Sequence, residues 1–232
     1  MRYWIITVLT GGALGVATML TPVGGYLGMT GGADKIEDVS RAELLKKIET
    51  MRIDAVRMIS DGKNEEAFQI LLKLVDINHY DQFPYVQLAR ALEAMTEEKF
   101  LPTLTKAAST LPALEMDRTL AAVYFHANKA ESAKKHIDAF LKTKPDDLAG
   151  LFYKGSIARL SGDNAEAVKI LTGVIGREKT YYFAYLELNL AYEKLGDEAN
   201  AGKMMELALK NSPSNNKEGI CHGLPSPDEK KV

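Results

Sequence analysis

The sequence is short of several features that define common protein classes. Cysteine occurs once, at Cys221, so the chain can form no internal disulfide and no cysteine-based zinc site. Neither sign of charge is in excess: the formal net charge of -2 gives no electrostatic basis for nucleic-acid binding. Only 8 prolines interrupt the 232 residues, which leaves room for long helices.

Signals of catalysis and of cofactor binding are also missing. The 4 histidines are scattered and show no metal-ligand spacing. No glycine-rich phosphate loop follows a predicted strand. The Cys221-His222 pair is similar to the end of a c-type haem motif, but covalent haem normally needs two cysteines and the first is absent. We therefore expect no enzyme activity, no metal site and no cofactor.

Charged residues are absent from Tyr3 to Ala33, and the part up to Leu20 is strongly apolar. A helix needs roughly 20 apolar residues to cross a bilayer. Arg2 precedes this segment and acidic residues follow it. Because the positive end of such a segment stays in the cytoplasm, we expect one membrane span in an inner (cytoplasmic) membrane, with the rest of the chain in the periplasm or an equivalent lumen.

Two membrane interpretations compete for this segment. The first is an uncleaved signal anchor, in which Gly11-x-x-x-Gly15 would let a second helix approach closely. The second is a secretory signal peptide cut after Ala33, with Gly31 at the −3 position. We favour the anchor, because cleavage there would leave an unusually long stretch after Leu20. A buried helix of a soluble domain is disfavoured, since each glycine would cost it about 1 kcal/mol.

A 34-residue spacing recurs through most of the remaining chain. Alanines and turn glycines repeat at this distance, and aromatic residues and prolines repeat at twice this distance. The residues that show it are Ala133, Ala167 and Ala201; Gly162 and Gly196; Tyr124 and Tyr192; and Pro145 and Pro213.

This pattern resembles the tetratricopeptide signature, in which two helices per repeat stack on their neighbours. The resemblance implies an all-α solenoid of about five helix-turn-helix repeats. Ser40 and Glu43 predict a capped helix over 41–60, and Asp163 and Asp197 predict caps of two later helices. We divide the chain into a membrane segment (1–33), a linker with a helix extension (34–47), a repeat array (48–215) and a polar tail (216–232). Within the array, the clear units are 114–147, 148–181 and 182–215, 48–81 is recognisable, and about 81–113 is degenerate.

Two surfaces of such an array are candidate contact sites. Tetratricopeptide arrays usually bind a peptide in the concave groove lined by the first helix of each repeat, and two arginines there could hold carboxylates or carbonyls of a partner. The alternative is that the phenylalanines pack between repeats and the arginines are solvated. The predicted groove residues are Tyr85, Arg118, Phe125, His126, Phe152, Ser156, Arg159 and Leu186. The last helix offers a second docking or self-association surface at Met204, Met205 and Leu209.

These features favour a membrane-anchored scaffold or adaptor that binds other envelope proteins and assists assembly or maturation of a complex. The arrangement is similar to accessory factors of the secretion translocon and of cytochrome c maturation. The alternative is a stoichiometric subunit of a larger membrane complex. The expected partners are a peptide segment or helix of another protein, with self-association also open.

Overall fold

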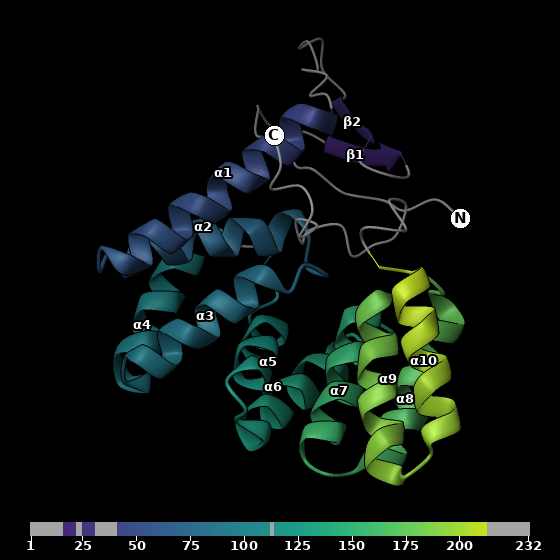
Figure 1. Ribbon diagram of the computed structural model, residues 1–232. Coiled ribbons are helices and arrows are strands. Elements are labelled where there is room, and N and C mark those ends of the chain that lie inside the picture. Colours follow the sequence, from purple (N-terminus) through teal and green to yellow (C-terminus); the bar gives the residue numbers. More distant parts are fainter. Residues whose placement is uncertain (1–15, 22–24, 31–40, 112–113, 213–232) are drawn as a thin grey trace.

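The computed structural model describes residues 16–21, 25–30, 41–111 and 114–212. Two strands, β1 (Val16–Thr21) and β2 (Gly25–Thr30), precede ten described helices that form five consecutive pairs (Figure 1). The pairs are α1 (Arg41–Ser60) with α2 (Asn64–Ile77), α3 (Phe83–Ala94) with α4 (Glu97–Ala108), α5 (Met116–His126) with α6 (Ala130–Thr143), α7 (Leu148–Leu160) with α8 (Asn164–Arg177), and α9 (Tyr182–Leu195) with α10 (Glu198–Lys210).

The strand pair corrects the expectation of a helix through the apolar N-terminal segment. β1 and β2 are antiparallel, in a register that runs from Val16 opposite Thr30 to Thr21 opposite Gly25. The physical reason lies in composition: glycine weakens a helix, whereas valine, threonine and tyrosine suit strands. Among the described residues, no helix is long and apolar enough to cross a membrane. The most apolar part of the segment, within 1–15, lies outside the described residues.

Helix boundaries follow the predicted signals. The helix predicted over 41–60 is α1, although its proposed cap Ser40 lies outside the described residues. The Asp163 carboxylate accepts a hydrogen bond from the Glu166 amide, and the Asp197 carboxylate accepts one from the Asn200 amide. These contacts satisfy amides that the first turn of a helix leaves unpaired, so both predicted caps are confirmed.

Four of the five pairs turn through a residue in the left-handed region. Gly62, Gly162 and Gly196 have φ of +74°, +89° and +75°, and Asn128 has φ of +55°. At each place the next amide donates to the carbonyl five residues back, which closes the first helix with a Schellman motif. Asn128, which the sequence interpretation missed, lies 34 residues before Gly162, and asparagine is the residue that best replaces glycine there.

The second pair turns differently. Its link, Met95 and Thr96, is extended at both residues instead of left-handed. Helix α4 packs mainly against α2 and only slightly against α3, and the rings of Phe68 and Phe100 meet edge to face at 5.3 Å. The degenerate unit therefore keeps two helices but not the usual packing between them.

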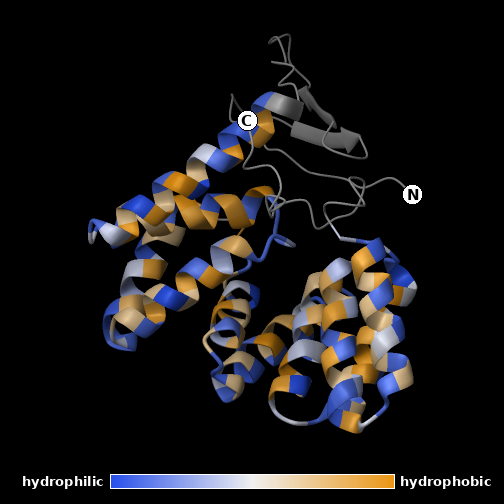
Figure 2. Ribbon diagram, in the orientation of Figure 1, coloured by the Kyte–Doolittle hydropathy of each residue, from blue (hydrophilic) through white to orange (hydrophobic). Residues whose placement is uncertain are grey.

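The first helices of the pairs form one row. Neighbouring members α1, α3, α5, α7 and α9 contact each other in order along the array. Along each helix apolar and polar residues alternate, as one-sided burial requires (Figure 2). Small residues allow the close approach within pairs: Ala67, Ala133 and Ala167 are fully buried, and a Cβ added to Gly155 would lie 2.7 Å from Leu171 Cγ. The row of first helices carries the candidate site.

Candidate functional site

An apolar hollow of about 310 Å³, the inner pocket, opens on this row of helices. Its side chains come from the start of α3, the end of α5, the middle of α7 and the first half of α9. Six of the nine are apolar. The lining residues are Gln82, Phe83, Val86, Phe125, His126, Phe152, Phe183, Leu186 and Glu187.

Gln82, the residue before α3, connects α5, α7 and the segment before α3 at the base of this pocket. Its Oε1 accepts a hydrogen bond from the Tyr153 hydroxyl at 3.0 Å and lies 2.9 Å from His126 Nε2, while its Nε2 donates to the Tyr80 carbonyl at 3.1 Å. Since an amide oxygen only accepts, His126 Nε2 must carry a proton. Burial lowers the pKa of His126 to about 4, so the ring is neutral at pH 7. His126 is therefore a structural donor, and its charge is not available to a partner.

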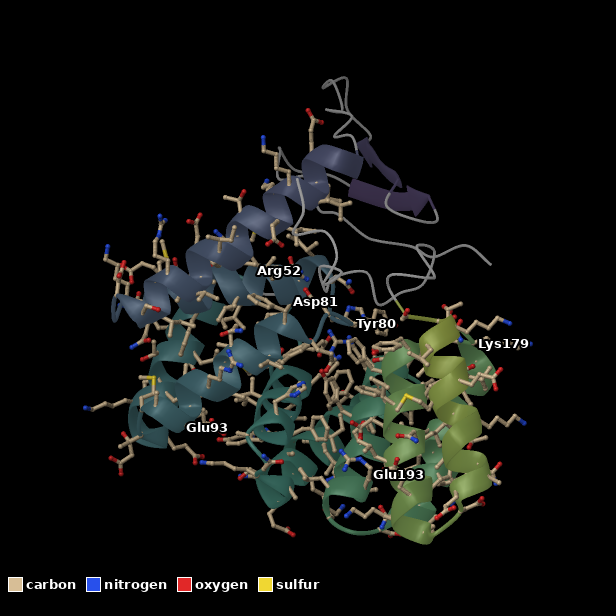
Figure 3. All side chains as sticks on the ribbon, in the orientation of Figure 1. Arg52, Tyr80, Asp81, Glu93, Lys179 and Glu193 are labelled. Atoms are coloured by element: carbon tan, nitrogen blue, oxygen red, sulfur yellow. The ribbon has the colours of Figure 1, made fainter. Side chains whose placement is uncertain are left out.

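The segment before α3 also reaches the far half of the array. The ring of Tyr80, which is labelled in Figure 3, meets that of Tyr181 edge to face. Their centroids are 5.5 Å apart. The hydroxyl of Tyr85, a fully buried residue, donates to the His79 carbonyl. The pocket thus lies over a fixed floor that connects the first repeats with the fourth and fifth.

Glu187 meets Arg159 at one side of the pocket. Arg159 Nε lies 2.6 Å from the Glu187 carboxylate, and both side chains are largely shielded from solvent. Burial raises the pKa of Glu187, and Arg159 opposes that shift. Arg159 is thus already occupied by a carboxylate of its own chain, which corrects its assignment as a ligand for a partner carboxylate.

Arg118 is occupied in the same way. It lies 3.3 Å from Asp147, 29 residues later, with its guanidinium over the Phe140 ring at 5.4 Å. Arg52 repeats this arrangement with Asp81, also 29 residues later and 2.6 Å away (Figure 3). Both arginines are buried. The arrangement is a recurring internal clamp, neither a free anion site nor a solvated charge.

The structure brings together half of the predicted groove residues. Phe125, His126, Phe152 and Leu186 line the inner pocket. Tyr85 and Ser156 are fully buried, and the Ser156 hydroxyl donates to the Phe152 carbonyl, so neither can touch a partner. The five lining residues that the sequence interpretation missed are Gln82, Phe83, Val86, Phe183 and Glu187.

A detectable signal existed for one of the missed residues. Phe183 lies three residues before Leu186 and therefore on the same helical face. The residues of α3 were hidden by the one-residue deletion and missing glycine of the degenerate unit, which blurred the register of 81–113.

A second hollow of about 410 Å³, the α1 hollow, adjoins the inner pocket. Phe83 lines both hollows. Ile53 is 59% exposed and Val56 41% exposed there, both large values for aliphatic side chains. The other lining residues are Glu49, Arg52 and Arg57.

The predicted surface on the last helix is smaller than expected. Met204 is buried and belongs to the core, whereas Met205 and Leu209 are exposed. A docking role for those two residues stays a prediction. In the stretches that the structure describes, no group of three or more His, Cys, Asp or Glu residues could hold a metal ion, and Cys221 lies outside them.

Comparison with known proteins gives a distant likeness. No family model matches the chain, and no curated protein matches it. Solved structures with a similar fold include MamA proteins. A MamA chain from Desulfovibrio magneticus RS-1 is 16% identical with a TM-score of 0.45, over 73% of this chain and 97% of that one. A second MamA crystal structure is 15% identical with a TM-score of 0.42, over 78% and 98%.

Proposed function

We propose that this chain is a non-enzymatic scaffold of the tetratricopeptide type, whose inner pocket binds an apolar side chain of a partner protein. The observation that carries the proposal is the open apolar lining contributed by α3, α5, α7 and α9. Apolar surface that converges in a hollow and remains accessible is typical of a binding site, whereas scattered exposed residues are not.

The lining divides into a fixed base and an accessible wall. Phe125 and Phe152 are 8% and 2% exposed and belong to the core. Val86, Phe183 and Leu186 are only partly buried. A partner side chain would cover these wall residues without moving the base, which keeps the ordering cost of binding low.

Peptides selected for binding to the full chain should lose affinity when the wall gains a charge. From a phage-displayed library of random 16-residue peptides, we expect binders that bind Leu186→Lys about 10-fold or more weakly, because the lysine would desolvate against the apolar wall. Synthetic copies of the selected peptides and fluorescence anisotropy measure the affinity. Leu195→Lys is the control and should bind as wild type does, because Leu195, at the end of α9, is 50% exposed and lines neither hollow. If Leu186→Lys, folded by circular dichroism, binds equally well, the pocket is not the site.

The proposal also includes a membrane anchor before the array, with the array in the periplasm and a role in assembly of an envelope complex. Its support is the sequence pattern alone: Tyr3 to Ala33 carries no charged residue, while the described part of that run forms the strands β1 and β2. We expect the full chain to stay in the membrane pellet after alkaline carbonate extraction, and a chain starting at Asp34 to be released. Release of both forms would argue against an integral anchor. Co-purification in fixed stoichiometry with one complex would instead favour the alternative of a structural subunit.

A further inference from the structure

Large apolar side chains are exposed at the two ends of the array. Among the described helices they lie on α1, α9 and α10, and none lies on α2 to α8. Figure 1 shows α1 at one end of the row of helices and α9 with α10 at the other. Repeat arrays usually finish in terminal repeats with a polar outer face, so two apolar ends call for a covering partner. The exposed residues are Leu45, Ile53, Val56, Leu190, Leu195, Met205 and Leu209.

The α1 end exposes a position that later repeats bury. This position comes directly after the clamp arginines of α1 and α5 and recurs at 34-residue spacing on α7 and α9. Its residues are Ile53, Thr119, Tyr153 and Glu187. Ile53 is 59% exposed, whereas Thr119 and Tyr153 are fully buried. The same place in the repeat is thus covered inside the array and open at its start.

In the later repeats the preceding first helix covers this position. The Tyr153 ring on α7 meets the Phe125 ring on α5, with centroids 6.0 Å apart. Glu187 on α9 pairs with Arg159 on α7 at 2.6 Å. Because α1 follows no other described helix, Ile53 has the inner position without the helix that would cover it.

The α10 end exposes positions that face the following repeat. Ile137, Leu171 and Met205 repeat at 34-residue spacing on α6, α8 and α10. The first two are 1% and 0% exposed, but Met205 is 38% exposed. Helices α6 and α8 each pack against the first helix of the next pair, whereas α10 is the last described helix. Leu190 on α9 is likewise 38% exposed, where its counterpart Ser156 is fully buried.

We propose that copies of this chain stack head to tail, with α1 of one copy packed against α9 and α10 of the next. The internal contact between repeats identifies the occupant, because Ile53 faces the place of a preceding repeat and Met205 the place of a following one. Two different surfaces meet in such a contact, so it does not close at two copies and can add further ones. Neither residue lines the inner pocket, so the inference does not depend on the proposed function.

Charged groups at the junction limit its strength. The stacked copies would lack the ion pair that joins α7 to α9, because Glu193 takes the place of its arginine and Ile53 that of its glutamate. Glu49 and Arg57 lie one helical turn before and after Ile53, so charges of both signs lie beside it. Glu193 would lose water against an isoleucine. We therefore expect Glu193→Gln to associate more strongly than wild type.

Two charge variants each block one end. Ile53→Lys blocks the α1 end and Met205→Lys the α10 end, and Leu190→Lys replaces Met205→Lys if circular dichroism shows that the latter does not fold. Leu195→Lys is the matched control: Leu195 is 50% exposed, and its counterpart Ser161 is exposed even though another repeat follows it. Light scattering after gel filtration of the full chain in mild detergent measures the mass, at up to about 100 μM to populate a contact of roughly micromolar Kd.

Wild type and Leu195→Lys should grow in mass with concentration and pass the dimer, whereas Ile53→Lys and Met205→Lys should each associate at least 10-fold more weakly. An equimolar mixture of the two blocked variants should form dimers and stop there, because each keeps the end that the other lacks. If either blocked variant alone associates as wild type does, the contact is not head to tail. A wild type that never associates, or a mixture that stays monomeric, also overturns the inference.

Discussion

Replacing Asp81 with alanine should lower the free energy of unfolding by about 3–5 kcal/mol, because it leaves the buried Arg52 guanidinium without its partner. The two side chains are 4% and 6% exposed. Glu49 lies 3.9 Å from Arg52 but is half exposed, so it offsets little of the loss. Alanine also removes the acceptor of the Phe83 amide. Urea unfolding followed by circular dichroism measures the change.

The chain contains a matched control for this effect. Arg57 and Asp54 also lie 2.6 Å apart, but their side chains are 64% and 33% exposed. An exposed pair contributes about 0–1 kcal/mol, so Asp54→Ala should cost less than 1 kcal/mol. Equal losses for Asp81→Ala and Asp54→Ala would contradict burial as the cause.

A double variant separates the cost of an unpaired charge from the value of the pair. Burial raises the pKa of Asp81 by more than Arg52 and the Phe83 amide lower it, so these contacts do not fully offset the desolvation of the carboxylate. Arg52→Met with Asp81→Asn removes both charges and keeps an oxygen for the Phe83 amide. We expect it to recover at least half of the stability lost in Asp81→Ala. No recovery would mean that the ion pair itself stabilises this part of the fold.

The same clamp shows what sequence reasoning could and could not reach. The 34-residue spacing predicted the helix pairs, because each turn glycine and small residue meets a local backbone or packing requirement. Arg118 was placed correctly on the inner row of helices, but its role was wrong. Its partner Asp147 comes 29 residues later, just before α7. Such a pairing depends on how the second helix of the repeat brings the chain back beside the first. The repetition of the same spacing at Arg52 and Asp81 was the available signal.

The degenerate unit, 81–113, shows a second limit of prediction from the sequence. Without a turn glycine, the Met95-Thr96 link is extended, and α4 packs against α2. A missing glycine predicts a different turn, but the new helix direction depends on long-range packing such as Phe68 against Phe100. The lining of the inner pocket was therefore predicted on α5 and α7, only in part on α9, and not on α3.

The array should lose stability as pH falls from about 6.5 to 4, because two histidines are held neutral. Burial lowers the pKa of His79 to about 4, with Arg118 and Lys144 adding to the shift and Asp147 opposing it. Burial alone lowers the pKa of His126 to about 4. Both would titrate near 6.5 in the unfolded chain, which therefore binds more protons in this window. Stability then rises with pH across the window and is fully regained above about 6.5.

Other titrating groups determine how large the net loss of stability is. Burial raises the pKa of Asp81 and of Glu187, so their protonation favours the folded state as pH falls and offsets part of the loss. The two histidines alone set an upper limit of about 3 kcal/mol each, and we expect a net loss of about 2–4 kcal/mol between pH 6.5 and 4.5. Urea unfolding at a series of pH values measures it.

His126→Gln tests the assignment to a particular group. Glutamine carries its amide nitrogen as many bonds from Cα as His126 Nε2, which lies 2.9 Å from Gln82 Oε1, so it can still donate there, but it does not titrate. The variant should be less stable than wild type at pH 7, because the ring packing is lost, yet its stability should fall less steeply with acid. Adding His79→Asn should flatten the profile further. A double variant with the wild-type slope would show that carboxylates, not these two rings, govern the acid sensitivity of the array.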